Sequence, residues 1–323
     1  MAAPDETGSN TVKGALLSLG AFAVFATHDV AVKILGATYS PFQIIFFAVL
    51  LSFPLLSIML IRDAEPGTLR PQQPGWMAVR TIALTINGPC AFYAFAVLPL
   101  AQAYAILFAM PLLVTIMAIP LLGETVRLHR WMAVIVGLIG VLVVLRPGAG
   151  EFSLGHLIAI LAAISSALAA VLLRKIGQNE RREVILLYPM LANFAVSLCV
   201  LPFVYQPMPL ADLGLVVVVA AFALVGMSLL IRAYVHADAA IVAPMQYSQI
   251  LWATAFGLLL FDEVPSVYTV FGAGIIIASG AYIVLREGAA GRASLRPVQL
   301  TLGRRAETGT LPHPPLNQPP HDS

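Results

Sequence analysis

Long apolar stretches, separated by short polar connections, run through most of the chain. Each stretch is about 20 residues long, the length an α-helix needs to cross roughly 30 Å of hydrocarbon at 1.5 Å per residue. The pattern predicts an all-α membrane protein with ten transmembrane helices, at residues 12–36, 41–61, 76–98, 100–122, 130–146, 154–174, 184–205, 212–234, 239–261 and 267–286. The connections between these helices leave no room for a domain outside the membrane.

Motifs of the first half recur in the second half at a spacing of about 140 residues. The segment Val144-Leu145-Arg146-Pro147-Gly148 returns as Val284-Leu285-Arg286-Glu287-Gly288. Each copy holds five predicted helices, and an odd number places the two copies upside down relative to each other in the membrane. Inverted repeats with a site at their interface are a recurring design of secondary transporters. The predicted division is a cytoplasmic N-terminal segment 1–11, a first repeat 12–148, a second repeat 154–288 and a disordered cytoplasmic tail 289–323.

The composition supports a membrane protein and argues against several other classes. Charged residues make up 11% of the chain, against about 25% in soluble domains. The net charge of +2 is too small to indicate a nucleic-acid partner. Cys90 and Cys199 both lie inside apolar stretches, so we interpret them as core residues and not as a disulfide or metal pair.

The distribution of basic residues predicts the orientation. With the N-terminus in the cytoplasm, all but two of the 18 lysines and arginines fall on the cytoplasmic side. The exceptions are Lys33 and Arg146. Positive charge is concentrated on the cytoplasmic side of membrane proteins, so both termini are predicted to be cytoplasmic in a multi-pass protein of a bacterial inner membrane.

Several motifs resemble those of one transporter family. The first copy contains Leu98-Pro99-Leu100-Ala101-Gln102-Ala103-Tyr104-Ala105-Ile106, Pro111-Leu112-Leu113-Val114 and Leu122-Gly123-Glu124, and the second contains Ala240-Ile241-Val242-Ala243-Pro244-Met245-Gln246-Tyr247, Trp252 and Asp262-Glu263. In this order and spacing they resemble the EamA-type repeats of the drug/metabolite transporter superfamily, over about residues 14–288. The resemblance implies ten helices, alternating access and a central cavity lined mainly by helices 1, 3 and 4 and their counterparts 6, 8 and 9. It also implies a cargo such as an amino acid, a nucleotide-like metabolite, a vitamin or an amphiphilic drug.

His28 and Asp29 are polar residues inside the first predicted helix. A charge at a helix centre costs roughly 2.5–3.5 kcal/mol on insertion scales, so Asp29 is expected to avoid lipid. One interpretation is a proton-coupling pair, His28 and Asp29, on the transport path. The other is an ion pair between Asp29 and Lys33, four residues on, that fixes the end of the helix. Ala169 and Ala170 stand at the matching positions of the second repeat, so the charge belongs to one half only.

Arg80 and Asn87 share one face of the third predicted helix. Arg80 is interpreted either as an anchor for a cargo carboxylate or phosphate, through its planar guanidinium, or as a residue that snorkels to the membrane interface. Asn87 lies near mid-membrane, where it either lines the cavity or forms a hydrogen bond between helices.

The fourth and ninth predicted helices occupy matching positions in the two repeats and carry aromatic and amide residues. Pro244 frees a backbone carbonyl for water or cargo. Aromatic and amide side chains together suit a flat or amphiphilic solute, although ordinary packing between helices explains them equally. Trp252 is either a cavity wall or core filler. The predicted cargo-binding residues are Arg80, Asn87, Tyr104, Phe108, Gln246, Tyr247, Gln249 and Trp252.

No motif of an enzyme or an ATP-driven pump stands out in the sequence. It contains no His-Glu-x-x-His, no phosphate-binding glycine loop and no cysteine pair at metal spacing, so we predict no catalytic residues, no cofactor and no metal. The sequence predicts a secondary-active transporter of a small organic metabolite, most of all an amino acid or related amphiphile, driven by proton coupling or exchange. A membrane-embedded enzyme and a non-transporting membrane scaffold are the alternatives.

Overall fold

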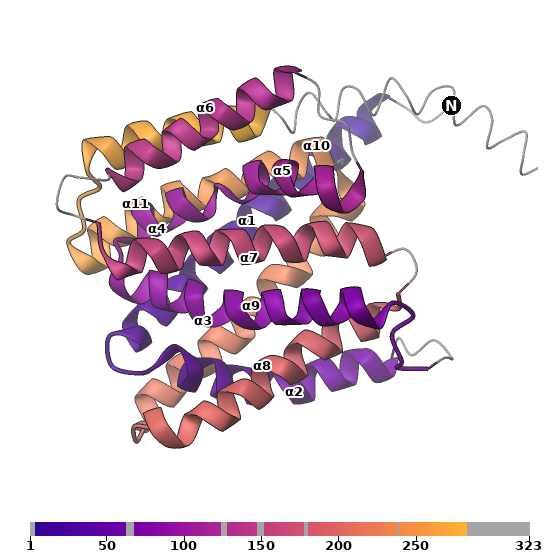
Figure 1. The fold of residues 1–323 in the computed structure, drawn as a ribbon, viewed down its shortest axis with the longest axis vertical. Coiled ribbons are helices and arrows are strands. Elements are labelled where there is room, and N and C mark those ends of the chain that lie inside the picture. The colour runs from indigo at the N-terminus through magenta and orange to yellow at the C-terminus, as the bar shows by residue number, and fades with distance from the viewer. Residues whose placement is uncertain are drawn as a thin grey trace, which may run out of the picture.

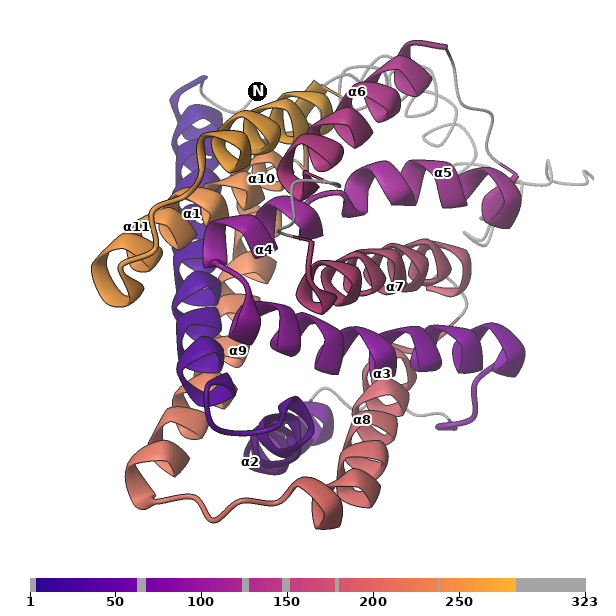
Figure 2. The same cartoon turned by 60° about the vertical axis from the view of Figure 1, so that its left-hand side comes forward.

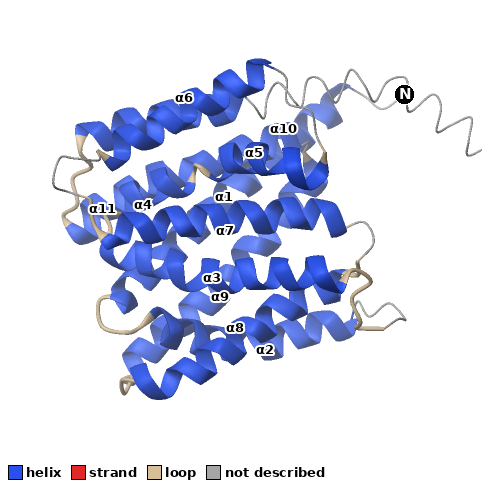
Figure 3. Cartoon of the chain, in the orientation of Figure 1, coloured by secondary structure: helices blue, strands red, loops and turns tan. Residues whose placement is uncertain are grey.

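The computed structural model describes residues 4–62, 68–123, 128–146, 152–177, 180–237 and 239–282. Within these ranges every regular element is a helix and no strand occurs (Figure 3). The predicted tail 289–323 lies outside the described residues.

The helices follow the predicted apolar stretches closely, and prolines mark several of their starts. Pro41 and Pro74 stand at first helical residues, where a missing N–H costs nothing, and Pro99 and Pro209 directly precede helices. Gly123 and Asp262, both in the left-handed conformation, end two others. The elements are α1 (Pro4–Gly36), α2 (Pro41–Arg62), α3 (Pro74–Val97), α4 (Leu100–Leu107), α5 (Met110–Leu122), α6 (Leu128–Leu145), α7 (Leu154–Ile176), α8 (Arg182–Val204), α9 (Leu210–His236), α10 (Ala239–Val242), η1 (Ala243–Tyr247), α11 (Ser248–Phe261) and a last helix, Val267–Tyr282.

Two of the predicted continuous helices are broken. The stretch 100–122 divides into α4 and α5 at Phe108 and Ala109, and the stretch 239–261 divides into α10, the 3-10 helix η1 and α11. Pro111 and Pro244 explain the breaks, because a proline has no N–H to donate to the carbonyl four residues before it. The interruptions fall at matching positions of the two halves, a pattern that marks binding sites in transporters built from repeats.

The first helix begins before the predicted apolar span. The sequence placed a polar segment at 1–11 before the first helix, but α1 begins at Pro4. The apolar part of α1, Val12–Gly36, agrees with the predicted span. The polar residues before it extend the same helix.

Five stretches are long and apolar enough to cross a membrane: Val12–Gly36, Leu100–Leu122, Leu154–Ile176, Val184–Val204 and Leu210–His236. Shorter apolar helices lie at Pro41–Ser52, Trp131–Leu145 and Val267–Tyr282. Within the described residues α3 does not meet the same criterion of length and apolarity, because Arg80, two threonines and Asn87 lower its hydropathy. The full set of ten spans is therefore a proposal.

Two long helix pairs form the centre of the bundle. α1 packs along α9, and α3 packs along α7 (Figure 2). The repeat relates these pairs, because each joins the first helix of one half to the third helix of the other. Gly226 on α9 lets Phe25 on α1 approach closely, since a Cβ at this position would lie 2.7 Å from the Phe25 ring. Small residues of this kind allow helices to pack tightly in a membrane.

The other helices flank these pairs. α2 packs against α8, and α4 packs against α11. In Figure 1, α3 and α7 lie in front of α1 and α9. Because α4 packs against α11, the two broken helices contact each other inside the bundle.

The two halves differ in the contact between their first and third helices. α1 packs against α3, so closely that a Cβ on Gly36 would clash with Ala96, whereas within the described residues their counterparts α7 and α9 barely touch. The α1–α3 contact lies at the end of the bundle that holds Lys33, Leu98 and Glu263, which we call the Lys33 end. In an inverted repeat the matching α7–α9 contact belongs to the opposite end. In the part of the chain that the structure describes, α1 and α3 therefore contact each other at the Lys33 end, and α7 and α9 make no comparable contact.

Candidate functional site

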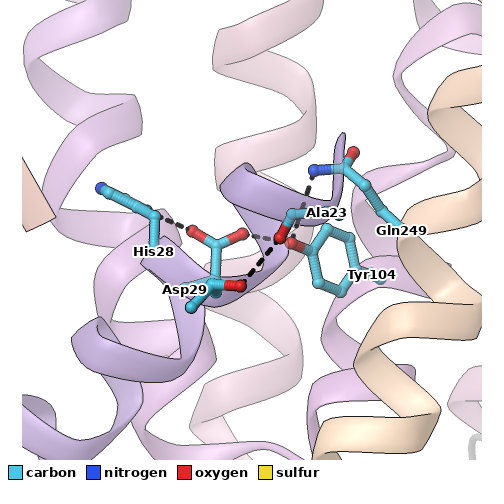
Figure 4. A network of polar contacts seen from close by, with 6 residues as sticks. Ala23, His28, Asp29, Tyr104 and Gln249 are labelled. Atoms are coloured by element: carbon cyan, nitrogen blue, oxygen red, sulfur yellow. Dashed lines mark hydrogen bonds and ion pairs between the residues drawn. The ribbon is translucent and has the colours of Figure 1, made fainter. Parts of the chain in front are cut away.

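A polar network surrounds Asp29 inside the apolar bundle (Figure 4). The Asp29 carboxylate lies between His28 and Tyr104, with the His28 Nδ1 atom 2.7 Å from Oδ1 and the Tyr104 hydroxyl donating to Oδ2. Gln249 Nε2 in turn donates to the Tyr104 hydroxyl oxygen, over 3.4 Å. Asp29 is only 8% exposed. The network therefore joins α1, α4 and α11 through four of the predicted site residues.

Each oxygen of the Asp29 carboxylate has one hydrogen-bond partner. An ionised carboxylate only accepts hydrogen bonds, so the contact with an ionised Asp29 requires a proton on Nδ1 of His28. The His28 ring also packs edge-on against Phe92 of α3, with centroids 5.9 Å apart. Hydrogen bonds to a charged group are roughly twice as strong as neutral ones, and these two stabilise the carboxylate away from water.

The predicted alternative partner of Asp29, Lys33, is engaged elsewhere. Lys33 Nζ lies 2.8 Å from Oε1 of Glu263, in the turn before the last helix. The interpretation of an Asp29–Lys33 ion pair was therefore wrong. Proton coupling by His28 and Asp29 stays a prediction.

A row of aromatic rings passes through the break between α4 and α5. Ring centroids are 5.3 Å apart for Phe95 and Tyr104, 5.8 Å for Tyr104 and Phe108, and 5.3 Å for Phe108 and Tyr247. The last pair joins repeat counterparts across the two halves. The Tyr247 ring joins the row, but its hydroxyl points to Gly280 of the last helix. A Cβ on Gly280 would clash with that hydroxyl.

Arg80 lies apart from this network. Its side chain is buried and Nη1 donates to the Ile185 carbonyl over 2.8 Å, which connects α3 to α8. A buried guanidinium is not snorkelling, so that interpretation was wrong. Its predicted role as a cargo anchor remains untested beside this clear structural contact.

The remaining predicted residues also lie outside the network. Asn87 is half-buried on α3, and Gln246 is half-buried in η1. Trp252 is 38% exposed and stacks on Phe256 of the same helix. The two interpretations of Trp252, cavity wall and core filler, both stay predictions.

Sequence reasoning missed a second cluster, centred on Lys33. Besides Glu263, Lys33 Nζ donates to the carbonyl of Leu98 over 2.7 Å and to that of Phe95 over 3.3 Å. Glu263 Oε2 accepts the backbone N–H of Leu100 over 3.0 Å. In the sequence, Glu263 stood out only as part of the Asp262-Glu263 motif of the second repeat. A lysine inside a predicted span was the signal that it needed a distant partner.

Two further contacts tie the loops together at the same end. The Tyr39 hydroxyl donates to Asp212 over 2.6 Å, and this hydrogen bond raises the pKa of Tyr39 above its usual value. The Gln43 side chain donates to the Gln206 carbonyl and accepts from its N–H. These bonds connect the α1–α2 corner to the α8–α9 corner.

The duplicated organisation has a counterpart among known proteins. Residues 12–146 and 153–285 each match the EamA-like transporter family. The chain belongs to this family. The resemblance predicted from the sequence is therefore confirmed, with the family's domain present twice.

Relatives of this EamA-like transporter carry different small metabolites. The S-adenosylmethionine uptake transporter of Rickettsia bellii is 27% identical over 81% of this chain and 90% of its own length. The pseudopaline exporter of Pseudomonas aeruginosa is 28% identical over 82% of this chain and 94% of its own. The riboflavin transporter of Vibrio cholerae is 29% identical over 74% and 80%. One solved structure, 21% identical, has a TM-score of 0.56 over 85% of this chain and 96% of the other, which supports the fold. This chain is thus a multi-pass membrane transporter of small metabolites.

Proposed function

We propose that this EamA-like transporter is a secondary-active carrier of a positively charged, amino-acid-derived metabolite, with S-adenosylmethionine as the first candidate. The observation that carries the proposal is the buried Asp29 carboxylate, held where both broken helices meet α1. A carboxylate at this depth is costly unless a cation or a proton compensates it.

The chemistry of the site suits such a cargo. S-adenosylmethionine combines a sulfonium cation, an amino-acid group and a flat adenine base. Asp29 would attract the cation, and the faces of Tyr104 and Phe108 attract both cations and flat rings. Each Asp29 oxygen has one partner, His28 or Tyr104, and keeps a further lone pair that a cationic cargo can use.

Alternating access is the second part of the proposal. Its support is the closure of α1 on α3 at the Lys33 end without a matching closure of α7 on α9. We assign the Lys33 end to the outside of an inner membrane and both termini to the cytoplasm, because only Lys33 and Arg146 among the 18 basic residues belong to that side. The structure then represents an inward-facing state.

The driving force is proposed to be a proton gradient that acts through Asp29 and His28, or exchange of one cargo for another. A proton and a cationic cargo satisfy the same carboxylate, so movement of one can be linked to movement of the other. The chain is proposed to have no catalytic activity.

Flux through reconstituted protein tests the function. Proteoliposomes preloaded with unlabelled S-adenosylmethionine should accumulate the labelled compound by exchange, and excess riboflavin should compete only weakly because it lacks the cation. A binding cargo should also raise the thermal stability of the detergent-solubilised protein, by about 2.7 kcal/mol at 100 times its Kd. If no cationic metabolite is accumulated and none stabilises the protein, the proposal is contradicted. Release of a chemically altered product in detergent would favour the enzyme alternative instead.

The orientation has its own test. In a variant without Cys90 and Cys199, a cysteine at the exposed Thr38 should react with a membrane-impermeant maleimide added outside intact cells. A cysteine at the exposed Leu69 should not react. The reverse labelling pattern would overturn the assignment.

A further inference from the structure

Lys33 connects three segments that are far apart in the sequence. It lies on α1, its Nζ binds the carbonyls of Phe95 and Leu98 at the end of α3, and it pairs with Glu263 in the turn before the last helix. Glu263 extends the connection to the first residue of α4 by accepting the N–H of Leu100. We call Lys33, Glu263 and these backbone groups the Lys33 cluster.

The Lys33 cluster lies next to the Asp29 network, on the side of the Lys33 end of the bundle. Lys33 follows Asp29 by four residues on α1, and Leu100 precedes Tyr104 by four residues on α4. At 1.5 Å per residue, each step is about 6 Å along its helix. The two helices are thus connected twice, once through Asp29 and Tyr104 and once through Lys33, Glu263 and Leu100. Any movement that lets cargo leave Asp29 toward this end has to separate the second connection.

The burial of the cluster makes it suited to a state-dependent contact. The side chains of Lys33 and Glu263 are 10% and 19% exposed. Two buried charges stabilise each other while they are paired. If one is removed and the other stays buried, the remaining charge destabilises the structure. Separation into water relieves that cost, so the pair favours either a closed end or a hydrated, open end over a half-open one.

The two repeats differ in their treatment of these positions. Asp29 has alanine, Ala170, at the matching position of α7, whereas Lys33 has a second basic residue, Arg174. A binding group is needed once, but a closing group is needed at both ends of an alternating-access carrier. The recurrence of a cation at the Lys33 position, and not at the Asp29 position, fits a role in closure.

We propose that the Lys33–Glu263 pair is the latch of the outer gate, which holds α1 against the α3–α4 corner and separates each time the Lys33 end opens. The inference rests on the alternating-access part of the proposed function. It adds the residues whose contact sets the balance between the inward-facing and outward-facing states.

Distances between spin labels test the latch directly and need no cargo. Labels are attached to cysteines at Thr38 and Val264, which are exposed and flank the cluster, in protein without Cys90 and Cys199 that is reconstituted in lipid. The unmodified latch should give mainly a short distance. Lys33→Met removes the cation and leaves Glu263 uncompensated, so the ratio of long to short distances should rise by about tenfold or more. Glu263→Gln keeps the contact with Leu100 and should give a smaller increase in the same direction.

Arg146→Met is the matched control. Arg146 is the other basic residue assigned to this side, and it stacks over the Tyr268 ring, 3.8 Å from the centroid, outside the cluster. Its removal should leave the distances unchanged. Unchanged distances in both Lys33→Met and Glu263→Gln, or an equal shift in Arg146→Met, would overturn the latch. If Lys33→Met does not fold, Glu263→Gln alone decides. Because the readout is a distance and not flux, a failed latch leaves the transport proposal standing, and absent transport leaves the distances interpretable.

Discussion

α1 and its repeat counterpart α7 show how the two halves of this transporter share packing but not the acidic group of the site. Each packs lengthwise against a helix of the other half, α1 along α9 and α7 along α3. Only α1 carries His28 and Asp29, and α7 has Ala169 and Ala170 in their place. Tyr104, the aromatic partner of Asp29, also belongs to one half only, because Ala243 stands at its matching position in the second half.

This difference separates the requirements of the scaffold from those of the site. Packing in the bundle needs small residues, and Gly226 against Phe25 or Ala169 inside α7 supplies them. A bound cargo has no two-fold symmetry, so one carboxylate between the halves is sufficient. The two halves therefore share the helices and their breaks, whereas the carboxylate and its two direct partners, His28 and Tyr104, lie in the first half alone.

Moving the carboxylate from α1 to α7 should have the largest effect. The double variant Asp29→Ala, Ala170→Asp has the same net charge, but the new aspartate has neither Tyr104 nor His28 beside it. Flux of S-adenosylmethionine in proteoliposomes should fall by more than about 100-fold, since bonds to a charged group contribute about 1.5–3 kcal/mol each. Restored flux would show that the two halves are interchangeable. The single variant Ala170→Asp controls for damage to α7.

Removing one hydroxyl should have an intermediate effect. Tyr104→Phe keeps the aromatic row but loses the bonds to Asp29 and Gln249. Exchange flux should fall by about tenfold, the effect of one charge-assisted hydrogen bond. Phe108→Tyr, which adds a hydroxyl nearby without removing one, is the matched control. Full flux in Tyr104→Phe would remove Tyr104 from the site.

Arg80 and Asn87 separate a structural role from a transport role on the same face of α3. Arg80→Gln loses the bond to the Ile185 carbonyl, so thermal unfolding in detergent should show a loss of about 1–3 kcal/mol in stability, with flux per folded molecule within about threefold of normal. Asn87→Leu should show the opposite, with lower flux at unchanged stability. A large loss of flux in folded Arg80→Gln would restore the cargo-anchor interpretation.

Trp252 should matter least. Its indole is partly exposed and packs on Phe256, far from a fully enclosed position. Trp252→Leu keeps an apolar side chain at this partly exposed position, so flux should stay within about twofold and stability within about 0.5 kcal/mol. A loss as large as that of Tyr104→Phe would return Trp252 to the cargo site.

The helices were predictable because a run of apolar residues records burial in lipid directly. The breaks in α4–α5 and α10–α11 were not placed, although Pro111 and Pro244 were visible, because a proline bends, breaks or merely starts a helix according to what packs around it. The apolar pattern also predicted α3 as a span, but Arg80 and Asn87 lower its mean hydropathy below that of the five clear spans.

The site was only partly predictable for a related reason. His28 and Asp29 were chosen as polar groups that avoid lipid, and Tyr104 and Gln249 as an aromatic and an amide suited to a cargo, but their mutual contacts depend on tertiary packing. For Lys33, the local pattern favoured Asp29 four residues away, whereas the structure supplies Glu263, 230 positions further along the chain. A buried charge can be recognised in a sequence, but the sequence alone does not name its partner.

The most direct test of the account compares Asp29→Asn with the unmodified protein in the same two assays. Asparagine keeps the shape of the side chain and can still bond Tyr104, but it neither carries a charge nor binds a proton in the neutral range. We predict that accumulation of S-adenosylmethionine driven by a pH gradient disappears in Asp29→Asn, while passive exchange at equal pH is reduced but measurable. Undiminished accumulation driven by the pH gradient in folded Asp29→Asn would contradict the central claim that this carboxylate couples cargo movement to protons.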